Sequence, residues 1–135
     1  MSEIVLASDI AELPRLVAHI AEFGKAHGLS AEAVGALQLA LEEVVTNVIV
    51  HGYQRMAGKT VRVRLACANR TVTAEVEDDA PAFDPLARPQ PEHVDHPVES
   101  RPIGGLGIHL VKKLMDTVEY QRNHDRNLLI LRKHC

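Results

Sequence analysis

The fold of this chain is decided by one stretch, Leu39-Ala40-Leu41-Glu42-Glu43-Val44-Val45-Thr46-Asn47-Val48-Ile49-Val50-His51-Gly52-Tyr53. Its apolar residues continue a pattern that starts at Val34 and recurs at spacings of three and four, which is typical of the buried face of a helix. Ser30 is a suitable N-cap, and Gly52 is a suitable end. The stretch is therefore predicted to be the second half of a long helix.

A second face of this helix carries Glu43 and Asn47, which are four residues apart, with His51 one turn further on. On a helical wheel Glu43 lies roughly 150° and Asn47 roughly 110° from the apolar centre. Such a pair is usually a solvated polar face. Here, however, the five residues from Thr46 to Val50 are all weak helix formers, and a local rule broken inside an element often marks a functional site. Both interpretations stay open on this stretch alone.

The composition is that of an ordinary globular protein. The 135 residues are 46% apolar and 24% charged, which predicts a single domain over residues 1–135. A net charge of −3 and the absence of Trp argue against a nucleic-acid partner. Cys67 and Cys135 suggest a reduced, cytoplasmic chain. Charged residues near the start predict no signal peptide, and we expect no apolar run of 18 residues and hence no membrane partner.

Three segments have the alternation or composition of strands, namely residues 3–7, 61–67 and 71–78. A first helix with an apolar stripe from Leu13 to Phe23 is predicted before the long one, with Asp9 and Glu12 at its start. The segment Gly58-Lys59-Thr60 lacks both the spacing and the element order of a phosphate-binding loop. We therefore interpret it as a turn.

Asp78 is notable because of its position in the third strand. Val72, Ala74 and Val76 share the buried face, and a period of two places Asp78 on that face as well. A carboxylate there is costly unless it accepts hydrogen bonds. The donor is either a neighbouring protein group or an N–H of a bound ligand, and the parity of the strand does not decide between them.

Six prolines lie between residues 81 and 102, where apolar periodicity is lost. Such a stretch inside a domain is typical of a functional lid or a flexible insertion, and we place a lid at about 80–103. His93 and His96 have a metal-like spacing, but no adjacent Cys or helix supports them. A metal site is therefore the less favoured interpretation of that pair.

Gly104-Gly105-Leu106-Gly107 ends the proline-rich segment and opens a predicted helix, Ile108 to Asp116. Glycines allow close approach to a ligand, and a helix N-terminus favours an anion. A simple hinge explains the same pattern.

A hairpin follows, with Val118 and Tyr120 in one strand and an apolar last strand, 127–131, that is predicted to be central. Together these elements predict an α+β fold, a two-layer sandwich with a mostly antiparallel mixed sheet and helices on one face.

The polar signals occur in one order along the chain: Glu43 with Asn47, then Asp78, then Gly105 and Gly107. Their order and spacing resemble the N, G1 and G2 boxes of the GHKL ATPase superfamily, which has the Bergerat ATP-binding fold. The runs 42–53, 77–85 and 104–111 resemble one branch in particular, the bacterial anti-sigma factor serine/threonine kinases. The resemblance covers nearly the whole chain.

This resemblance implies ATP and Mg²⁺ as cofactors. Asn47 would hold Mg²⁺ through its side-chain oxygen, Asp78 would accept the adenine amino group, and Glu43 would orient or deprotonate the attacking hydroxyl. The remaining residues expected at the nucleotide are Thr46, His51, Ala80, Arg101, Gly104, Gly105, Leu106 and Gly107. The wider superfamily has glycine at the positions of Ala80 and Ala82, and the kinases usually have an arginine closer to the glycines than Arg101.

Three functions are compatible with these features. The resemblance implies a kinase that phosphorylates a STAS-type anti-sigma factor antagonist, sequesters a sigma factor and forms a homodimer. The alternatives are an ATP-binding regulatory module without phosphotransfer, and the catalytic domain of a histidine kinase. The last is disfavoured because 135 residues leave no room for a phosphoacceptor helix.

Overall fold

A computed structural model of the chain describes residues 1–87 and 107–135. Its helices are α1 (Leu13–Ala26), α2 (Ala31–Asn47) and α3 (Gly107–Leu114), with short 3₁₀ turns at Ile10–Glu12 and Pro85–Ala87 and a π-helix, η2, at Val48–Gly52. Its strands are β1 (Ser2–Ala7), β2 (Thr60–Ala68), β3 (Thr71–Asp78), β4 (Thr117–Asn123) and β5 (Arg126–His134). Each predicted element is present, with ends that differ from the expected ones by a few residues.

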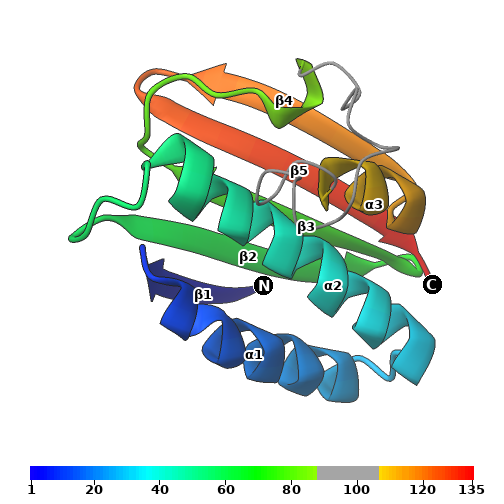
Figure 1. Cartoon of the computed structure of the whole chain (residues 1–135). Helices are drawn as coiled ribbons and strands as arrows, with labels where there is room; N and C mark the ends of the chain where they lie inside the picture. The colour runs from blue at the N-terminus through cyan, green and yellow to red at the C-terminus, as the bar shows by residue number, and fades with distance from the viewer. Residues whose placement is uncertain (88–106) are drawn as a thin grey trace, which may run out of the picture.

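The five strands form one sheet in the order β1-β2-β3-β5-β4, and the helices cover one of its faces (Figure 1). The predicted α+β sandwich is confirmed. All four pairings among the described strands are antiparallel, so the sheet is antiparallel throughout rather than mixed. The last strand, β5, lies between β3 and β4, as its apolar composition predicted.

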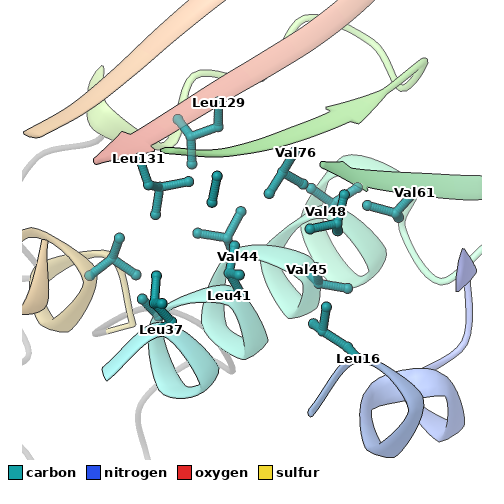
Figure 2. Packing of buried hydrophobic residues seen from close by; sticks show 14 of the residues in the cluster. Leu16, Leu37, Leu41, Val44, Val45, Val48, Val61, Val76, Leu129 and Leu131 are labelled. Carbon is teal, nitrogen blue, oxygen red and sulfur yellow. The ribbon is translucent and has the colours of Figure 1, made fainter. Parts of the chain in front are cut away.

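The core lies between α2 and the sheet (Figure 2). Leu41 and Val44 of α2 face the inner side chains of β3 and β5, and Val45 faces Leu16 of α1. The buried residues of β3 alternate strictly, and Asp78 continues that alternation at the strand end. The helix thus carries the polar residues Glu43 and Asn47 on a scaffold that is fixed by apolar packing on both sides.

The long helix begins and ends as the sequence predicted. Ser30 Oγ accepts the backbone N–H of Ala33 at 3.1 Å, and the helical segment ends at Gly52. Its last turn widens into a π-helix over Val48–Gly52, which overlaps the run of weak helix formers from Thr46 to Val50. Because π-turns are frequently found at functional sites, this widening supports a functional interpretation of the run.

One segment of the described chain meets the length and hydropathy criteria for a membrane-spanning helix. The continuous helix Ala31–Gly52 has 22 residues, and a window of 18 residues within it has a mean hydropathy of 1.5. Half of this window is buried inside the protein, where α2 contacts α1 and α3. The apolar character of the segment is that of a core helix, which satisfies the same length and hydropathy criteria as a membrane helix.

The turn interpretation of Gly58-Lys59-Thr60 is confirmed. Gly58 has φ +81°, a conformation that favours glycine, and Thr60 is the first residue of β2. Ser8, at the end of β1, accepts the N–H of Lys59 through its Oγ and donates to the carbonyl of Met56 at 2.7 Å. The backbone of this turn is therefore bonded to protein groups.

Candidate functional site

The pocket that contains the predicted site residues lies between the end of α2 and the inner face of the sheet. The pocket is narrow: about 20 Å³ is accessible to the centre of a water molecule, within roughly 390 Å³ of non-atom space that includes open solvent. Its polar lining comes from Asn47, Asp78, Tyr120 and Asn127, and its apolar lining includes Val44, Val76, Phe83, Ile108 and Leu129. Residues 47 and 78 are thus brought together from two elements that are separated in the sequence. An apolar pocket with a few convergent polar groups is the usual form of a small-molecule site.

Asn47 is more buried than the helical wheel suggested, because its side chain is only 4% exposed. Its Oδ1 is the single buried side-chain polar atom without a hydrogen-bond partner among the described residues. Leaving such an atom unpaired costs about 1–3 kcal/mol. An amide oxygen is a ligand that Mg²⁺ accepts, so this atom fits the metal expected at Asn47. No group of three or more His, Cys, Asp or Glu side chains that could hold a metal ion occurs in the described ranges.

Asp78 is 5% exposed and accepts two hydrogen bonds, both at Oδ1. The donors are the backbone N–H of Ala80 and Nδ2 of Asn127, each at 2.9 Å. Burial raises the pKa of the Asp78 carboxyl, while these two donors act in the opposite direction. Its Oδ2 makes no hydrogen bond to the described residues. The protein therefore satisfies one carboxylate oxygen, and the other remains as an acceptor beside the pocket.

Ala80 contributes through its backbone. Its N–H fixes Asp78, and its side chain is 2% exposed. The methyl group faces Gly52, since a Cβ built on that glycine would lie 3.4 Å from the Ala80 Cβ. Ala80 does not line the main pocket but a neighbouring one. The alanine at this position is thus accommodated by the glycine opposite to it.

Tyr53 holds the loop after β3 from the helix side. Its hydroxyl lies 2.7 Å from both the carbonyl of Thr60 and Oδ1 of Asp79, and it accepts the N–H of Asp79 at 3.0 Å. Burial raises the pKa of this hydroxyl well above its usual range, so it stays protonated and can donate at any physiological pH. The end of the long helix is therefore coupled to the segment that follows Asp78.

Replacing Tyr53 with Phe is expected to lower the free energy of unfolding by about 1–3 kcal/mol, because the N–H of Asp79 loses its acceptor. Chemical denaturation at pH 7 measures the change. Tyr53 does not line the main pocket. The binding free energy of a ligand in that pocket should therefore change by less than the free energy of unfolding does. Unfolding at the same denaturant concentration as the wild type would contradict this role of the hydroxyl.

The remaining predicted residues of the long helix lie at the edge of the site. Glu43 and Thr46 are half-buried and do not line the pocket. Burial, and then the charge of Glu42, raise the pKa of the Glu43 carboxyl. His51 stacks on Phe83 with ring centroids 6.3 Å apart and planes 18° from parallel, so it borders the pocket through that ring.

Several predicted residues lie outside the described ranges. These are Arg101, Gly104, Gly105 and Leu106, together with the His93 and His96 pair and most of the proposed lid. Gly107 is the first residue of α3, and the next residue, Ile108, lines the pocket. The start of this helix therefore lies beside the pocket, and the role of the glycines at the phosphates stays a prediction.

Asn127 is the main residue that the sequence analysis missed. It is 4% exposed, begins the inward-facing row of β5 and lies directly opposite Asp78 in the strand register. The signal that identified Asp78 applies here too. Leu129 and Leu131 are buried on the inner face, and a period of two extends that face to Asn127. Asp78 and Asn127 are both polar residues at an inward-facing position near a strand end, so the same pattern could have identified both from the sequence.

The sequence profile of the histidine kinase-like ATPase domain matches residues 6–133. The chain belongs to this family. Its members are ATPase domains, so adenine nucleotide is the expected ligand of the pocket, and the resemblance to the GHKL superfamily is confirmed.

Relatives in this family include serine-protein kinases. RsbW of Listeria monocytogenes serotype 4a is 32% identical over 95 residues, which are 68% of this chain and 60% of that protein. RsbW of Bacillus cereus is 28% identical over 107 residues, which are 77% of this chain and 65% of that protein. The chain therefore spans about three-fifths of the length of these relatives.

Solved structures show the same fold. The structure of the RsbU and RsbW domains of Rv1364c from Mycobacterium tuberculosis matches 98% of this chain and 31% of that chain, with a TM-score of 0.68 and 16% identity. The histidine kinase domain of Erythrobacter litoralis EL346 matches 93% of this chain and 60% of that chain, with a TM-score of 0.54 and 20% identity. At these identities the likeness supports the architecture alone.

Proposed function

We propose that this protein is an ATP-dependent serine/threonine protein kinase of the anti-sigma factor type. The observation that carries the proposal is a single pocket lined both by Asn47, whose Oδ1 is unpaired, and by Asp78, whose carboxylate is only half-satisfied. One end of this pocket offers an oxygen to a metal, and the other offers an acceptor to an amino group. Mg-ATP has both of the complementary groups.

In this proposal Asp78 Oδ2 accepts the adenine amino group, and the apolar lining excludes water from the base. Asn47 would hold Mg²⁺, which would neutralise phosphate charge when bound. Glu43 lies one helical turn before Asn47, at the edge of the site. Its carboxylate would accept the proton of a serine or threonine hydroxyl as that oxygen bonds to the terminal phosphorus and ADP leaves. Its raised pKa favours such a role, because a stronger base is left after ionisation.

The partners follow from the similarity to RsbW. The substrate would be a small STAS-type antagonist protein, and this protein would act as a homodimer. The amount of unphosphorylated antagonist would control how much sigma factor this protein holds.

The alternative is an ATP-binding module without phosphotransfer, and it is favoured by one observation: Glu43 does not line the pocket. Mass spectrometry of the candidate antagonist after incubation with this protein and Mg-ATP separates the two. A new phosphoserine or phosphothreonine supports the kinase, and none despite tight nucleotide binding supports the module.

Replacing Asp78 with Asn tests the adenine end of the site. The amide oxygen can keep the bonds from Ala80 and Asn127, but an NH₂ group then replaces Oδ2 and meets the adenine amine. We expect ATP to bind about 10- to 100-fold more weakly, since an unpaired buried donor costs about 1–3 kcal/mol. Saturating nucleotide, at 100 times its dissociation constant, should stabilise the wild type by about 2.7 kcal/mol.

Thermal melting over a series of Mg-ATP concentrations measures this difference. The melting temperature of the variant without nucleotide is the control, because it reports whether the internal bonds are kept. If the variant and the wild type show the same rise in melting temperature at every ATP concentration, Asp78 does not bind adenine.

A further inference from the structure

Asn127 is the most highly connected polar side chain in the described part of the chain. Its Nδ2 donates to Oδ1 of Asp78 at 2.9 Å and lies 3.2 Å from the carbonyl oxygens of both Ala80 and Pro81. An amide nitrogen carries two hydrogens. One is directed at Asp78, and the second is shared between the two carbonyls.

The opposite atom of the same side chain is an acceptor for three groups. Oδ1 of Asn127 accepts from the hydroxyl of Tyr120, from the guanidinium of Arg122 at 3.1 Å and from the backbone N–H of Phe83 at 3.3 Å. The donors on β4 thus fix which way the amide points. With Oδ1 committed to them, Nδ2 must face Asp78.

We propose that Asn127 is a positioning residue that orients Asp78 and the 80–83 segment for the adenine amino group. It occupies Oδ1 of Asp78, so that Oδ2 alone is presented to the ligand, and it holds Phe83 at the pocket wall through the same amide. This inference rests on the proposed ATP-binding function. It adds a residue of β5, together with Tyr120 and Arg122 of β4, to a site otherwise assigned to the α2 and β3 motifs.

Charge around Asp78 makes the role of Asn127 measurable. Burial has the largest effect on the Asp78 carboxyl and raises its pKa; the charge of Asp79 raises this pKa further, and the charge of Arg122 on β4 lowers it. On the helix side the neighbouring titratable group is the protonated Tyr53. The Asn127 amide opposes the effect of burial by donating to the ionised form.

The decisive variant is Asn127→Asp, which has the same shape. It keeps an acceptor for Tyr120, Arg122 and Phe83 but replaces the Nδ2 donor with a carboxylate oxygen beside Asp78. At pH 8 the two carboxylates repel, and we expect a non-hydrolysable ATP analogue with Mg²⁺ to bind at least tenfold more weakly than to the wild type. As the pH falls towards 5.5, the pair takes up a proton that can bridge the two groups, so the deficit should shrink.

Tyr120→Phe is the matched control for loss of a hydrogen bond without a change of charge: it removes one donor from Oδ1 of Asn127, while Arg122 and the N–H of Phe83 still hold that oxygen. Calorimetry at several pH values gives each dissociation constant, and the ratio of variant to wild type cancels the protonation of the nucleotide itself. For the control this ratio should not depend on pH. A purely structural role of Asn127 would also give a ratio that is constant with pH for Asn127→Asp, and that result would overturn the proposal.

Asn127→Ala keeps the test decisive if the charged variant does not fold. It should lower affinity about tenfold and move the pH at which binding fails upwards, because Asp78 loses a donor that favours its ionised form. An unchanged affinity and an unchanged pH midpoint would overturn the proposal. If the wild type itself binds no adenine nucleotide, the proposed function is wrong, and this inference is wrong with it. If the wild type binds and the Asn127 variants behave like the wild type, only this inference is wrong.

Discussion

Replacing Glu43 with Ala is expected to lower phosphorylation of the antagonist about 10²–10⁴-fold while nucleotide binding stays nearly unchanged. A general base assists only the step in which the phosphoryl group is transferred. Glu43 does not line the pocket that would hold adenine, so its loss should leave nucleotide binding nearly unchanged. Quantitative mass spectrometry of the phosphorylated antagonist measures the rate, and calorimetry measures binding. Sigma-factor binding should survive the substitution, because holding a partner requires no proton transfer.

Glu42→Ala is the matched control for this experiment. Glu42 is also half-buried and adjacent in sequence, but it points about 100° away around the helix. It should therefore change the rate little. Equal losses in both variants would show that the helix tolerates neither change, and an active Glu43→Ala would exclude Glu43 as the base.

The rate should also depend on pH in a defined direction. A general base acts in its ionised form, and burial raises the pKa of Glu43 above the usual value for a glutamate. The transfer rate of the wild type should therefore fall as the pH drops through this raised pKa, at a higher pH than an ordinary glutamate would give. The Glu43→Ala variant should lack this step in its pH profile.

The second large effect is expected at Asn47, where we predict that a loss of binding accompanies a gain in stability. In Asn47→Leu the unpaired buried Oδ1 is removed, and an apolar side chain with the same branching takes its place at the pocket wall. Without nucleotide, the free energy of unfolding should rise by about 1–3 kcal/mol. Binding of Mg-ATP should be lost, because the metal has no side-chain oxygen to bind.

Denaturant unfolding with and without Mg-ATP gives both quantities. Gln38→Leu on the same helix is the control, since Gln38 donates a hydrogen bond to the carbonyl of Val17 at 3.0 Å. Removing a satisfied polar group should not stabilise the protein. If Asn47→Leu is less stable than the wild type and still binds Mg-ATP, the unpaired oxygen is not a metal-binding group.

Much of the fold was predictable because the apolar spacing reports directly on burial. The period of the long helix and the alternation around Val72 predicted which faces are buried, and packing onto one side of a sheet is the arrangement that buries them all. The same rule predicted that Asp78 faces inwards, which is confirmed at 5% exposure. An apolar composition identified β5 as an interior strand before its neighbours were known.

The site itself was only partly predictable. Glu43, Asn47 and Asp78 are recognised by spacing, but spacing cannot say whether a polar atom finds a partner. Asn47 was expected well away from the apolar centre, and only the three-dimensional packing shows that it is buried with an unpaired oxygen. Arg101 and Gly104–Leu106 lie outside the described ranges, so their roles at the phosphates stay predictions.

The sequence by itself determined the local structure of each element: which apolar residues lie inside, where the long helix starts and ends, and which polar residues break the apolar pattern. Only the tertiary structure decided which of those polar residues meet. Antiparallel pairing of β3 with β5 sets Asn127 opposite Asp78, across 49 residues of chain. Strand register depends on pairing between distant segments, and periodicity within one segment carries no information about it.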